Sequence, residues 1–364
     1  MGVATDGALA LTPARFPPWL ALEAGRQGNE WEGWNMLRGN AHRTLQGTPR
    51  RALRWLLAVA AALLIGGATA QATYTVGLSL STLNNPFFVD VRDGAQQEAQ
   101  LFGIKLVVTD AQNDLNKQIS DIEDLIQQKV NVLLVNATDS AGVVPAVKEA
   151  NAAGIPVFAI DRAIDTSTGA QVVAQIASDN VYGGRLQARR VAEVLGSTGN
   201  VVELEGIPGA SAAIDRKSGF ESELKSVAPN VQIIADQPAG FDQAQGLNVM
   251  QNILQAHQGQ IDAVVAANDS MAVGALQAIQ QAGAKRPNGQ PIVVIGFDAI
   301  DQSLSQIKAG AMDSTVAQQP KLMGRLGVDA AHMLSLDSLM FSTLASGQFM
   351  PVAVQLITAQ NLPQ

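Results

Sequence analysis

The stretch YTVGLSLSTLNNPFFVD (residues 74–90) decides the fold, because it joins a strand directly to the start of a helix. YTVGLSL is a largely apolar run of strand length, whereas Asn85 followed by Pro86 is typical of a helix N-terminus. Phe87 and Phe88 then fall in the first helical turn, at the carboxyl end of the strand. Junctions of this kind are usually polar, so two aromatic rings there indicate more than a plain loop.

The alternation of strand and helix continues from residue 73 onward. The strand candidates are continuous apolar runs, as expected of parallel strands buried on both faces. Helices are predicted at 180–196, 242–257 and 269–283, each of which opens on Asn or Asp. Two sets of five strands predict two α/β lobes, each with a doubly wound parallel sheet. The strands are expected at 74–80, 104–110, 130–136, 155–161 and 171–178, then at 200–206, 231–237, 262–269, 291–298 and 313–319, with a last strand at 351–358 that returns to one sheet.

The charge distribution limits the partners of this chain. Its 364 residues hold 24 basic and 32 acidic groups, of which residues 1–72 hold seven Arg and four acids. The rest therefore carries 24 − 7 = 17 basic and 32 − 4 = 28 acidic groups. Because there is no basic stripe and the excess is acidic, we expect no nucleic acid partner.

The N-terminal region has the pattern of an export signal. Arg50, Arg51 and Arg54 precede the apolar run 55–65, and the small-residue stretch ATAQA follows at 68–72. The alternative is a membrane anchor, but the run is well short of the ~20 apolar residues that a span needs. We expect residues 1–72 to be removed and the body to be periplasmic or otherwise extracytoplasmic. The chain has no Cys, so we do not expect a lipoprotein.

Polar residues end several predicted strands, where open α/β sheets bind their ligands. Two facing sheets would aim both sets of strand ends into one cleft. Phe241 and Phe297 occupy places in the second half equivalent to those of Phe87 and Phe88. The alternative is that the rings simply pack into the sheets. The polar residues at strand ends are Asn136, Asp161, Arg162, Asn268, Asp269 and Asp298.

Aromatic faces combined with acids, amides and Arg suit a sugar. Carboxylates of Asp161 and Asp298 can each accept two hydroxyl protons, and an Arg can donate a planar fork to two oxygens. The two carboxylates could instead serve a glycosidase. However, both are expected beside an Arg, which lowers a carboxylate's pKa and makes it a poor acid. The body also holds only two His and no hydrolase, phosphate-loop or metal-ligand motif, so we expect no enzyme, no cofactor and no metal.

Several segments resemble the bacterial periplasmic ribose-binding proteins, in order over two thirds of the chain. They include STLNNPFF (81–88), NATDS (136–140), IPVFAIDR (155–162), IASDN (176–180), GLNVMQN (246–252) and VVIGFD (293–298). The resemblance implies the type I periplasmic-binding-protein fold, in which two lobes joined by three crossovers close over one sugar. It implies a first lobe of 73–177 plus 319–346 and a second of 178–318 plus 347–364.

The resemblance also implies a function and a binding site. The family's members deliver a sugar to the permease and ATPase of an ABC importer, and D-ribose or a closely related monosaccharide is the expected ligand. We expect a monomer, and whether a chemotaxis receptor also binds it stays open. Allose, galactose or a furanosyl signal molecule, and a sugar-responsive transcription regulator, are the alternatives. The family's sugar contacts fall on Ser81, Asn85, Phe87, Phe88, Asn136, Asp161, Arg162, Arg216, Phe241, Asn268, Asp298 and Gln318.

One segment departs from the relatives. SLDSLMFSTLASGQFM (335–350) looks longer and more apolar than their last connection. The position of the third crossover, expected around residues 345–350, is therefore open.

Overall fold

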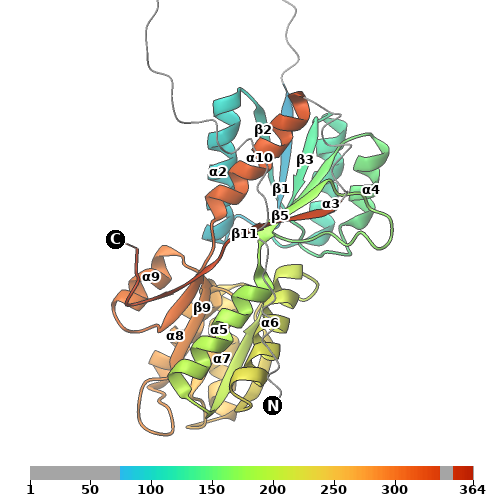
Figure 1. Ribbon diagram of the computed structural model, residues 1–364. Helices are drawn as coiled ribbons and strands as arrows, with labels where there is room; N and C mark the ends of the chain where they lie inside the picture. Colours follow the sequence, from blue (N-terminus) through green and yellow to red (C-terminus); the bar gives the residue numbers. More distant parts are fainter. Residues whose placement is uncertain (1–73, 337–346, 364) are drawn as a thin grey trace, which may run out of the picture. The chain divides into compact units, whose positions relative to one another are not determined.

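The computed structural model describes residues 74–336 and 347–363 (Figure 1). The chain divides into a unit of residues 1–70 and a unit of residues 71–364, and the second is the one described here. The expected export signal and most of the divergent segment 335–350 lie outside the described residues.

The first lobe is built on a parallel sheet in which the strand order is β11-β5-β4-β3-β1-β2. Because β1 pairs with both β2 and β3, the strand order reverses beside β1 and creates the switch point of a doubly wound sheet. The strands are β1 (Thr75–Leu80), β2 (Lys105–Asp110), β3 (Val132–Val135), β4 (Val157–Ile160), β5 (Ala174–Ser178) and β11 (Gln348–Val352).

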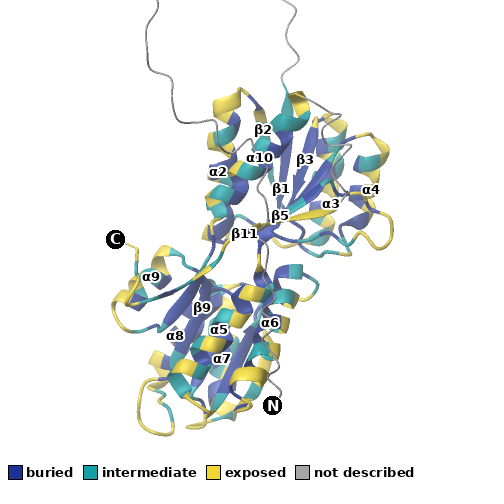
Figure 2. Cartoon of the chain, in the orientation of Figure 1, coloured by how far each residue is buried: buried dark blue, intermediate teal, exposed yellow. Residues whose placement is uncertain are grey.

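Helices cover both faces of this sheet. α2 (Pro86–Phe102) and α10 (Pro320–Leu336) pack together on one face, and α3 (Leu115–Gln127) and α4 (Val144–Ala152) cover the other. Successive residues of β3 point to opposite faces, so Leu134 joins the core under α2 and α10 while Leu133 joins the core under α3 and α4. Burial on both faces, visible as dark blue strands in Figure 2, explains the continuous apolar runs in the sequence.

The second lobe repeats this design with the strand order β12-β10-β9-β8-β6-β7. The last strand, β12, is antiparallel to β10, and the other pairs are parallel. α5 (Asn180–Leu195) packs with α6 (Ser211–Val227), α7 (Gln243–Ala256) packs with α8 (Asp269–Ala282), and α9 (Asp301–Lys308) follows β9. The strands are β6 (Thr198–Glu205), β7 (Asn230–Pro238), β8 (Ala263–Ala266), β9 (Val293–Asp298), β10 (Ser314–Ala317) and β12 (Gln355–Thr358).

The predicted α/β architecture and its ten strands are confirmed, but the last predicted strand is wrong. The stretch 351–358 is not one strand: β11 pairs with β5 in the first sheet, and β12 pairs with β10 in the second. Residues 348–352 therefore belong with the first lobe rather than the second. Residues 348–351 are apolar apart from Gln348 but exposed, and Pro351 suits the edge of a sheet.

The chain crosses between the lobes three times within the described residues. The crossings lie between β5 and α5, between β10 and α10, and between β11 and β12. The first two coincide with the crossovers expected near Ser178 and Gln318. The third lies at residues 353–354, a few residues beyond the expected position.

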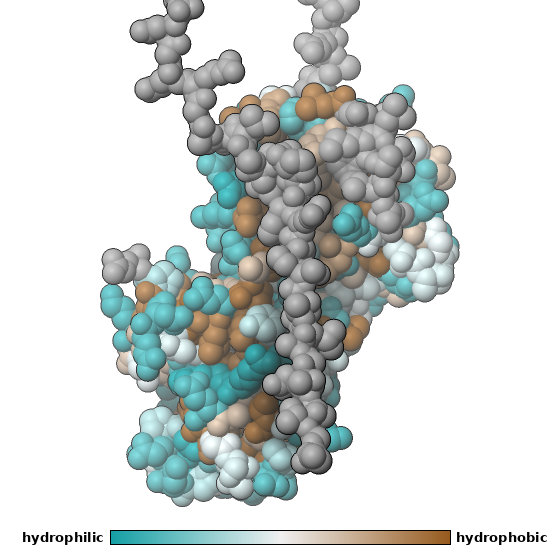
Figure 3. All heavy atoms as spheres, in the orientation of Figure 1, coloured by the Kyte–Doolittle hydropathy of each residue, from teal (hydrophilic) through white to brown (hydrophobic). Residues whose placement is uncertain are grey.

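The surface of the lobes is mixed in character. In the view of Figure 3, hydrophilic residues cover most of the lower lobe's outer end, with smaller hydrophobic areas between them. Within residues 74–336 and 347–363, no helix combines the length and the apolar character needed to cross a membrane.

Candidate functional site

A small cleft lies at the carboxyl ends of the strands of both sheets. The cavity in this cleft has a volume of only about 10 Å³, which is room for about one water molecule. Ten of the twelve residues predicted for the site line this cleft. The lining consists of Asn85, Phe87, Phe88, Asp161 and Arg162 from the first lobe, Ala212, Arg216, Phe241, Asn268 and Asp298 from the second, and Gln318 at the second crossover.

The rings of Phe87 and Phe88 stand at one wall of the cleft. The Asn85 side chain accepts a hydrogen bond from the Phe87 backbone N–H at 3.0 Å, so Asn85 caps α2 as predicted. The Phe87 and Phe88 rings meet edge to face, with centroids 5.1 Å apart. Both residues also belong to the core under α2 and α10. The packing interpretation and the cleft interpretation are therefore both correct for these rings.

On the first lobe, Asp161 and Arg162 follow directly from β4. Asp161 adopts a positive φ of 64°. Its Oδ2 accepts a hydrogen bond of 3.0 Å from the Asn136 side chain, and it lies 3.8 Å from the Arg162 Nε. Arg162 Nη1 donates to the Ala137 carbonyl at 3.2 Å. These contacts hold an acid and a guanidinium side by side at the strand end.

On the second lobe, Arg216 is held from two sides. Its Nε donates to Asn180 Oδ1 at 2.8 Å, and its Nη1 donates to the Ala267 carbonyl at 2.7 Å. α5 lies close to the backbone of α6 here, since Gly184 has no Cβ. A Cβ added at Gly184 would lie 2.1 Å from the Arg216 carbonyl oxygen. Arg216 Nη1 is then 3.8 Å from Asp298 Oδ1, and the second lobe also presents an acid and a guanidinium together.

Contacts between the lobes surround the cleft. The Arg162 guanidinium of the first lobe lies 5.2 Å from the ring centroid of Phe241 in the second lobe. Nearby, the Ala163 N–H donates to Ser211 Oγ at 2.7 Å, and the Ser140 N–H donates to the Gly209 carbonyl at 3.1 Å. The structure therefore has the lobes in contact around the site.

The pKa shifts at the site correct one expectation from the sequence. Burial raises the pKa of Asp298 to about 8, although Arg216 and the hydrogen bond from Gln318 oppose that rise. Burial likewise raises the pKa of Asp161 against the opposing effect of Arg162. We expected the Arg neighbours to lower both pKa values, and that was wrong because loss of hydration outweighs their charge. Burial also lowers the pKa of Arg162 to about 10.

Three residues singled out in the sequence lie outside the lining of the cleft. Ser81 and Asn136 are buried but do not line the cleft. Asn136 stands behind Asp161, and its Oδ1 accepts a hydrogen bond from the Ser81 N–H at 3.1 Å. Phe297 is fully buried under Arg216, whose guanidinium lies 3.7 Å from its ring centroid, so it supports that Arg instead of facing the cleft.

Two residues of the site were not predicted from the sequence. Ala212 lines the cleft as a small residue at the start of α6, and nothing in its type marks it. Asn180 holds Arg216 by accepting a hydrogen bond from its Nε. From the sequence we expected Asn180 only to begin a helix, and its burial beside Arg216 is visible only in the structure. Asp179, not Asn180, caps α5.

Three buried polar atoms of residues that line the cleft have no hydrogen-bond partner among the described residues. They are Asp161 Oδ1, Arg162 Nε and Gln318 Oε1. A buried polar group without a partner costs ~1–3 kcal/mol, so such groups usually mark the place of a polar ligand or water. The cleft thus offers unused acceptors and a donor between aromatic rings.

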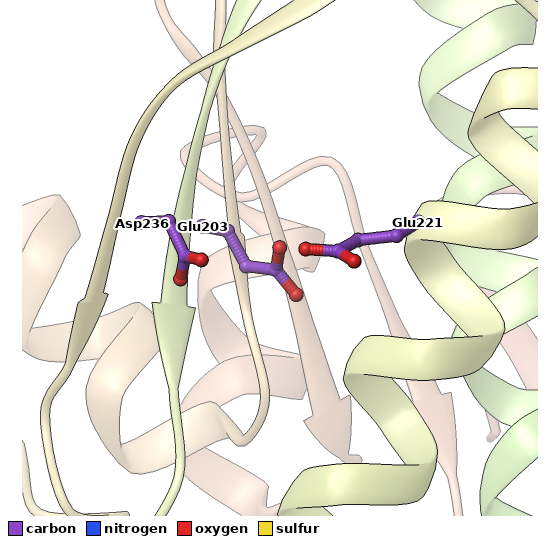
Figure 4. Close-up of side chains that lie close together, drawn as sticks. All are labelled: Glu203, Glu221 and Asp236. Carbon is purple, nitrogen blue, oxygen red and sulfur yellow. The ribbon is translucent and has the colours of Figure 1, made fainter.

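A separate acidic cluster lies on β6, α6 and β7 of the second lobe. Oxygens of Glu203, Glu221 and Asp236 lie within 4.8 Å of one another, with Glu203 between the other two (Figure 4). Lys217 forms ion pairs with Glu205 and Asp236, and its Nζ lies 3.6 Å from Glu221 Oε1. The ammonium group of Lys217 therefore supplies a cation there already, and the cluster does not indicate a metal site.

Comparison with known proteins identifies the family. The family described as "Periplasmic binding protein domain" matches residues 76–337, more than half of the chain. This chain belongs to that family.

Named relatives and solved structures agree with it. The chain is 48% identical to the ribose import binding protein of Bacillus subtilis, over 71% of this chain and 80% of that protein. It is 43% identical to the ribose import binding protein of Haemophilus influenzae, over 78% of this chain and 94% of that protein. The Caulobacter myo-inositol binding protein bound to myo-inositol superposes with a TM-score of 0.73 at 34% identity, covering 80% of this chain and 95% of that chain. The two lobes thus form a type I periplasmic-binding-protein fold.

Proposed function

We propose that this protein is a soluble extracytoplasmic receptor that binds D-ribose in the cleft between its lobes and delivers it to an ABC importer. The observation that carries the proposal is the pairing of an acid with an Arg on each lobe, across a cleft walled by Phe87, Phe88 and Phe241. The similarity to ribose import binding proteins over most of their length supports ribose among the possible sugars.

The chemistry of the cleft fits a monosaccharide. A sugar ring has C–H faces that stack on aromatic rings and a rim of hydroxyls that both donate and accept. Asp161 and Asp298 would accept from hydroxyls, while Arg162 and Arg216 would donate to ring or hydroxyl oxygens. Asn85, Asn268 and Gln318 can take either role. Because a stranded buried polar group is costly, such a site rejects sugars whose hydroxyls point elsewhere.

The arrangement of the Asp161 and Asp298 carboxylates suits binding of a sugar better than its hydrolysis. A glycosidase needs one carboxyl as a proton donor and the other as a nucleophile or base on either side of one bond. Here each carboxyl is paired with its own Arg, at 3.8 Å in both lobes. The raised pKa of Asp298 alone would permit acid catalysis, but hydrogen bonds from sugar hydroxyls would favour its ionised form. We therefore propose that the protein is not an enzyme.

The proposal extends to processing and partners. Residues 1–72 would be an export signal with its upstream extension, removed to leave a monomeric body without a lipid anchor. The permease and ATPase of the importer would be its macromolecular partners. The alternative ligands are allose, galactose or a furanosyl signal molecule, because the same fold occurs in a galactofuranose binding protein and in a binding protein with bound D-allose.

Calorimetric titration of the purified protein with D-ribose, D-arabinose, D-allose, D-galactose and myo-inositol tests the proposal. We expect the tightest binding for ribose and at least about 100-fold weaker binding for each of the others, since one misplaced hydroxyl strands a buried partner. The matched variants are Arg162→Ala, in the cleft, and Arg189→Ala, whose side chain is 51% exposed and pairs with Glu223. Ribose binding that is weaker than binding of another sugar, or equally strong in Arg162→Ala, would overturn the assignment.

A further inference from the structure

The turn that follows Asp298 has a backbone conformation that ordinary residues rarely adopt. Asp298 has a φ of 122° and Ala299 a φ of 60°, and neither is glycine. Such conformations are unfavourable for residues with a Cβ and persist only where surrounding groups hold them in place. Because Asp298 lines the cleft, whatever holds this turn also sets the direction of its carboxylate.

Asp269, the first residue of α8, holds the turn through both of its carboxylate oxygens. Oδ2 accepts a hydrogen bond of 3.0 Å from the Ile300 N–H. Oδ1 accepts a hydrogen bond of 2.8 Å from the Thr315 hydroxyl, and Thr315 Oγ1 in turn accepts one of 3.3 Å from the Ala299 N–H. Both backbone N–H groups after Asp298 are thus tied to Asp269, one directly and one through Thr315.

The surroundings of Asp269 are shaped to admit its carboxylate. It is fully buried, and a Cβ added at Gly296 of β9 would lie 1.9 Å from its Oδ1. α9 begins at Asp301 without a side-chain cap from its own N-cap residue, Ile300. Asp269 supplies an acceptor to that helix end from a different helix. Burial raises the pKa of Asp269 to about 7, and the hydrogen bonds from Thr315 and Ile300 oppose the rise.

We propose that Asp269 is a positioning residue for sugar binding, which acts through Asp298 without touching the sugar. The inference rests on the proposed function for its binding readout. Asp269 does not line the cleft, whereas Asp298 lines it and accepts a hydrogen bond of 2.6 Å from Gln318. Without the acceptor at Asp269, the turn relaxes toward ordinary φ values, and the Asp298 carboxylate no longer points into the cleft.

A double-mutant cycle separates positioning from a general loss of stability. Asp269→Ala is made in the parent, in Asp298→Ala and in Asp161→Ala, and ribose affinity is measured by calorimetry, with competition for weak variants. We expect Asp269→Ala to weaken binding by about 10-fold in the parent and in Asp161→Ala, but by less than about 2-fold in Asp298→Ala. Equal losses in all three backgrounds, or no loss in the parent, would overturn the proposal.

Two further variants control for folding. Asp269→Asn keeps one acceptor oxygen, so it should recover part of the affinity that Asp269→Ala loses. Met250 lies on α7 and belongs to the same core as residues of α8, so Met250→Ala opens a cavity in that core. It should lower the thermal midpoint while leaving ribose affinity unchanged in the folded protein. A loss of affinity in Met250→Ala as large as in Asp269→Ala would assign the effect to stability and contradict positioning.

A readout without sugar distinguishes this inference from the proposed function. If the parent does not bind ribose, the proposed function fails, and the sugar-free crystal structure of Asp269→Ala still decides the inference. We expect Asp298 to leave the positive-φ region and to lose its hydrogen bond with Gln318. An Asp298 that keeps both its φ and that bond in the variant would contradict the inference.

Discussion

Arg162 of the first lobe and Phe241 of the second lie in contact, with the guanidinium carbon 5.2 Å from the ring centroid. The same guanidinium lies 5.2 Å from the ring of Phe88 in its own lobe. The cation is thus placed between aromatic walls from both lobes, and its Nε has no hydrogen-bond partner among the described residues. A sugar that offers an oxygen to this guanidinium would complete its bonding and join both lobes at once.

Removing either charged partner of the cleft should weaken ribose binding strongly. We expect Arg162→Ala and Asp298→Ala each to reduce the binding free energy by ~2–5 kcal/mol, because each leaves a partner buried and unpaired. Arg162→Lys should not restore binding, since an ammonium cannot offer the planar fork of a guanidinium. Calorimetry checks this, with Arg189→Ala as the exposed control. Parent-like affinity in either Ala variant would show that the sugar binds elsewhere.

Ribose binding should release protons near neutral pH. With the lobes in contact and no sugar, burial raises the pKa of Asp298 to about 8, and hydroxyl donors from a sugar would stabilise the ionised carboxylate and lower that pKa. Affinity should therefore rise as pH increases toward about 8 and level off above it. Titration in two buffers with different heats of ionisation measures the protons released. Proton uptake at pH 7, or the same release in Asp298→Asn as in the parent, is incompatible with this account.

The buried acid of the second lobe predicts a pH-dependent stability. Burial, with Asp236 and Glu221 nearby, raises the pKa of Glu203 to about 9. Between the pKa of about 4.3 in the unfolded chain and that value, the folded state binds the extra proton, so stability falls as pH rises through this range. Glu203→Gln, a neutral isostere, should match the parent at pH 4 and exceed its unfolding free energy by about 1 kcal/mol or more at pH 8. Denaturant unfolding at both pH values measures this, and a variant less stable than the parent at pH 8 would refute it.

Export should remove the N-terminal region. The basic residues at 50–54, the apolar run and the small residues up to Ala72 predict mature protein that begins at Gln71 or Thr73. N-terminal sequencing of protein from the extracytoplasmic fraction checks this. Residues 1–49 found intact on cytoplasmic protein would count against export and favour the transcription regulator.

Much of the fold and the cleft could be predicted because buried parallel strands leave a clear pattern. Runs such as Val132–Val135 are apolar throughout, and the polar residues that follow them stand at the sheet edge where ligands bind. β11 escaped prediction because its last residues, Pro351 and Val352, run without a turn signal into β12, and the sequence does not show that the chain changes sheet between them. The packing of the Phe297 ring against Arg216 could not be predicted either, because a Phe at a strand end can face the cleft or support an Arg.

The effect of burial on charged groups could not be predicted from the sequence either. The pairing of Asp298 with Arg216 was foreseen, but the direction of its pKa shift depends on how completely both are dehydrated. Likewise, Asp269 was recognised only as a polar residue at a strand end. Asp269 fixes the turn at Ala299 and Ile300 by hydrogen bonds that depend on Thr315 and Gly296, which are far from it in the sequence and close to it only in the fold.

The central claim is that one monosaccharide is held by both lobes at once. Asp161 and Arg162 come from the first lobe, whereas Arg216 and Asp298 come from the second, and the cleft has room for about one water in this arrangement. The lobes must therefore open at the three crossovers to admit a sugar and close to satisfy both sets of contacts. A ligand favours the closed form only through its extra affinity for it.

Small-angle X-ray scattering of the processed protein, with and without ribose, measures this directly. The body after residue 72 has no Trp, so intrinsic Trp fluorescence cannot report the change. We expect saturating ribose to decrease the radius of gyration, and D-arabinose at the same concentration to leave it unchanged. The Asp298→Ala variant should respond only at much higher ribose concentration. Tight ribose binding with an unchanged scattering profile would contradict a sugar held by both lobes.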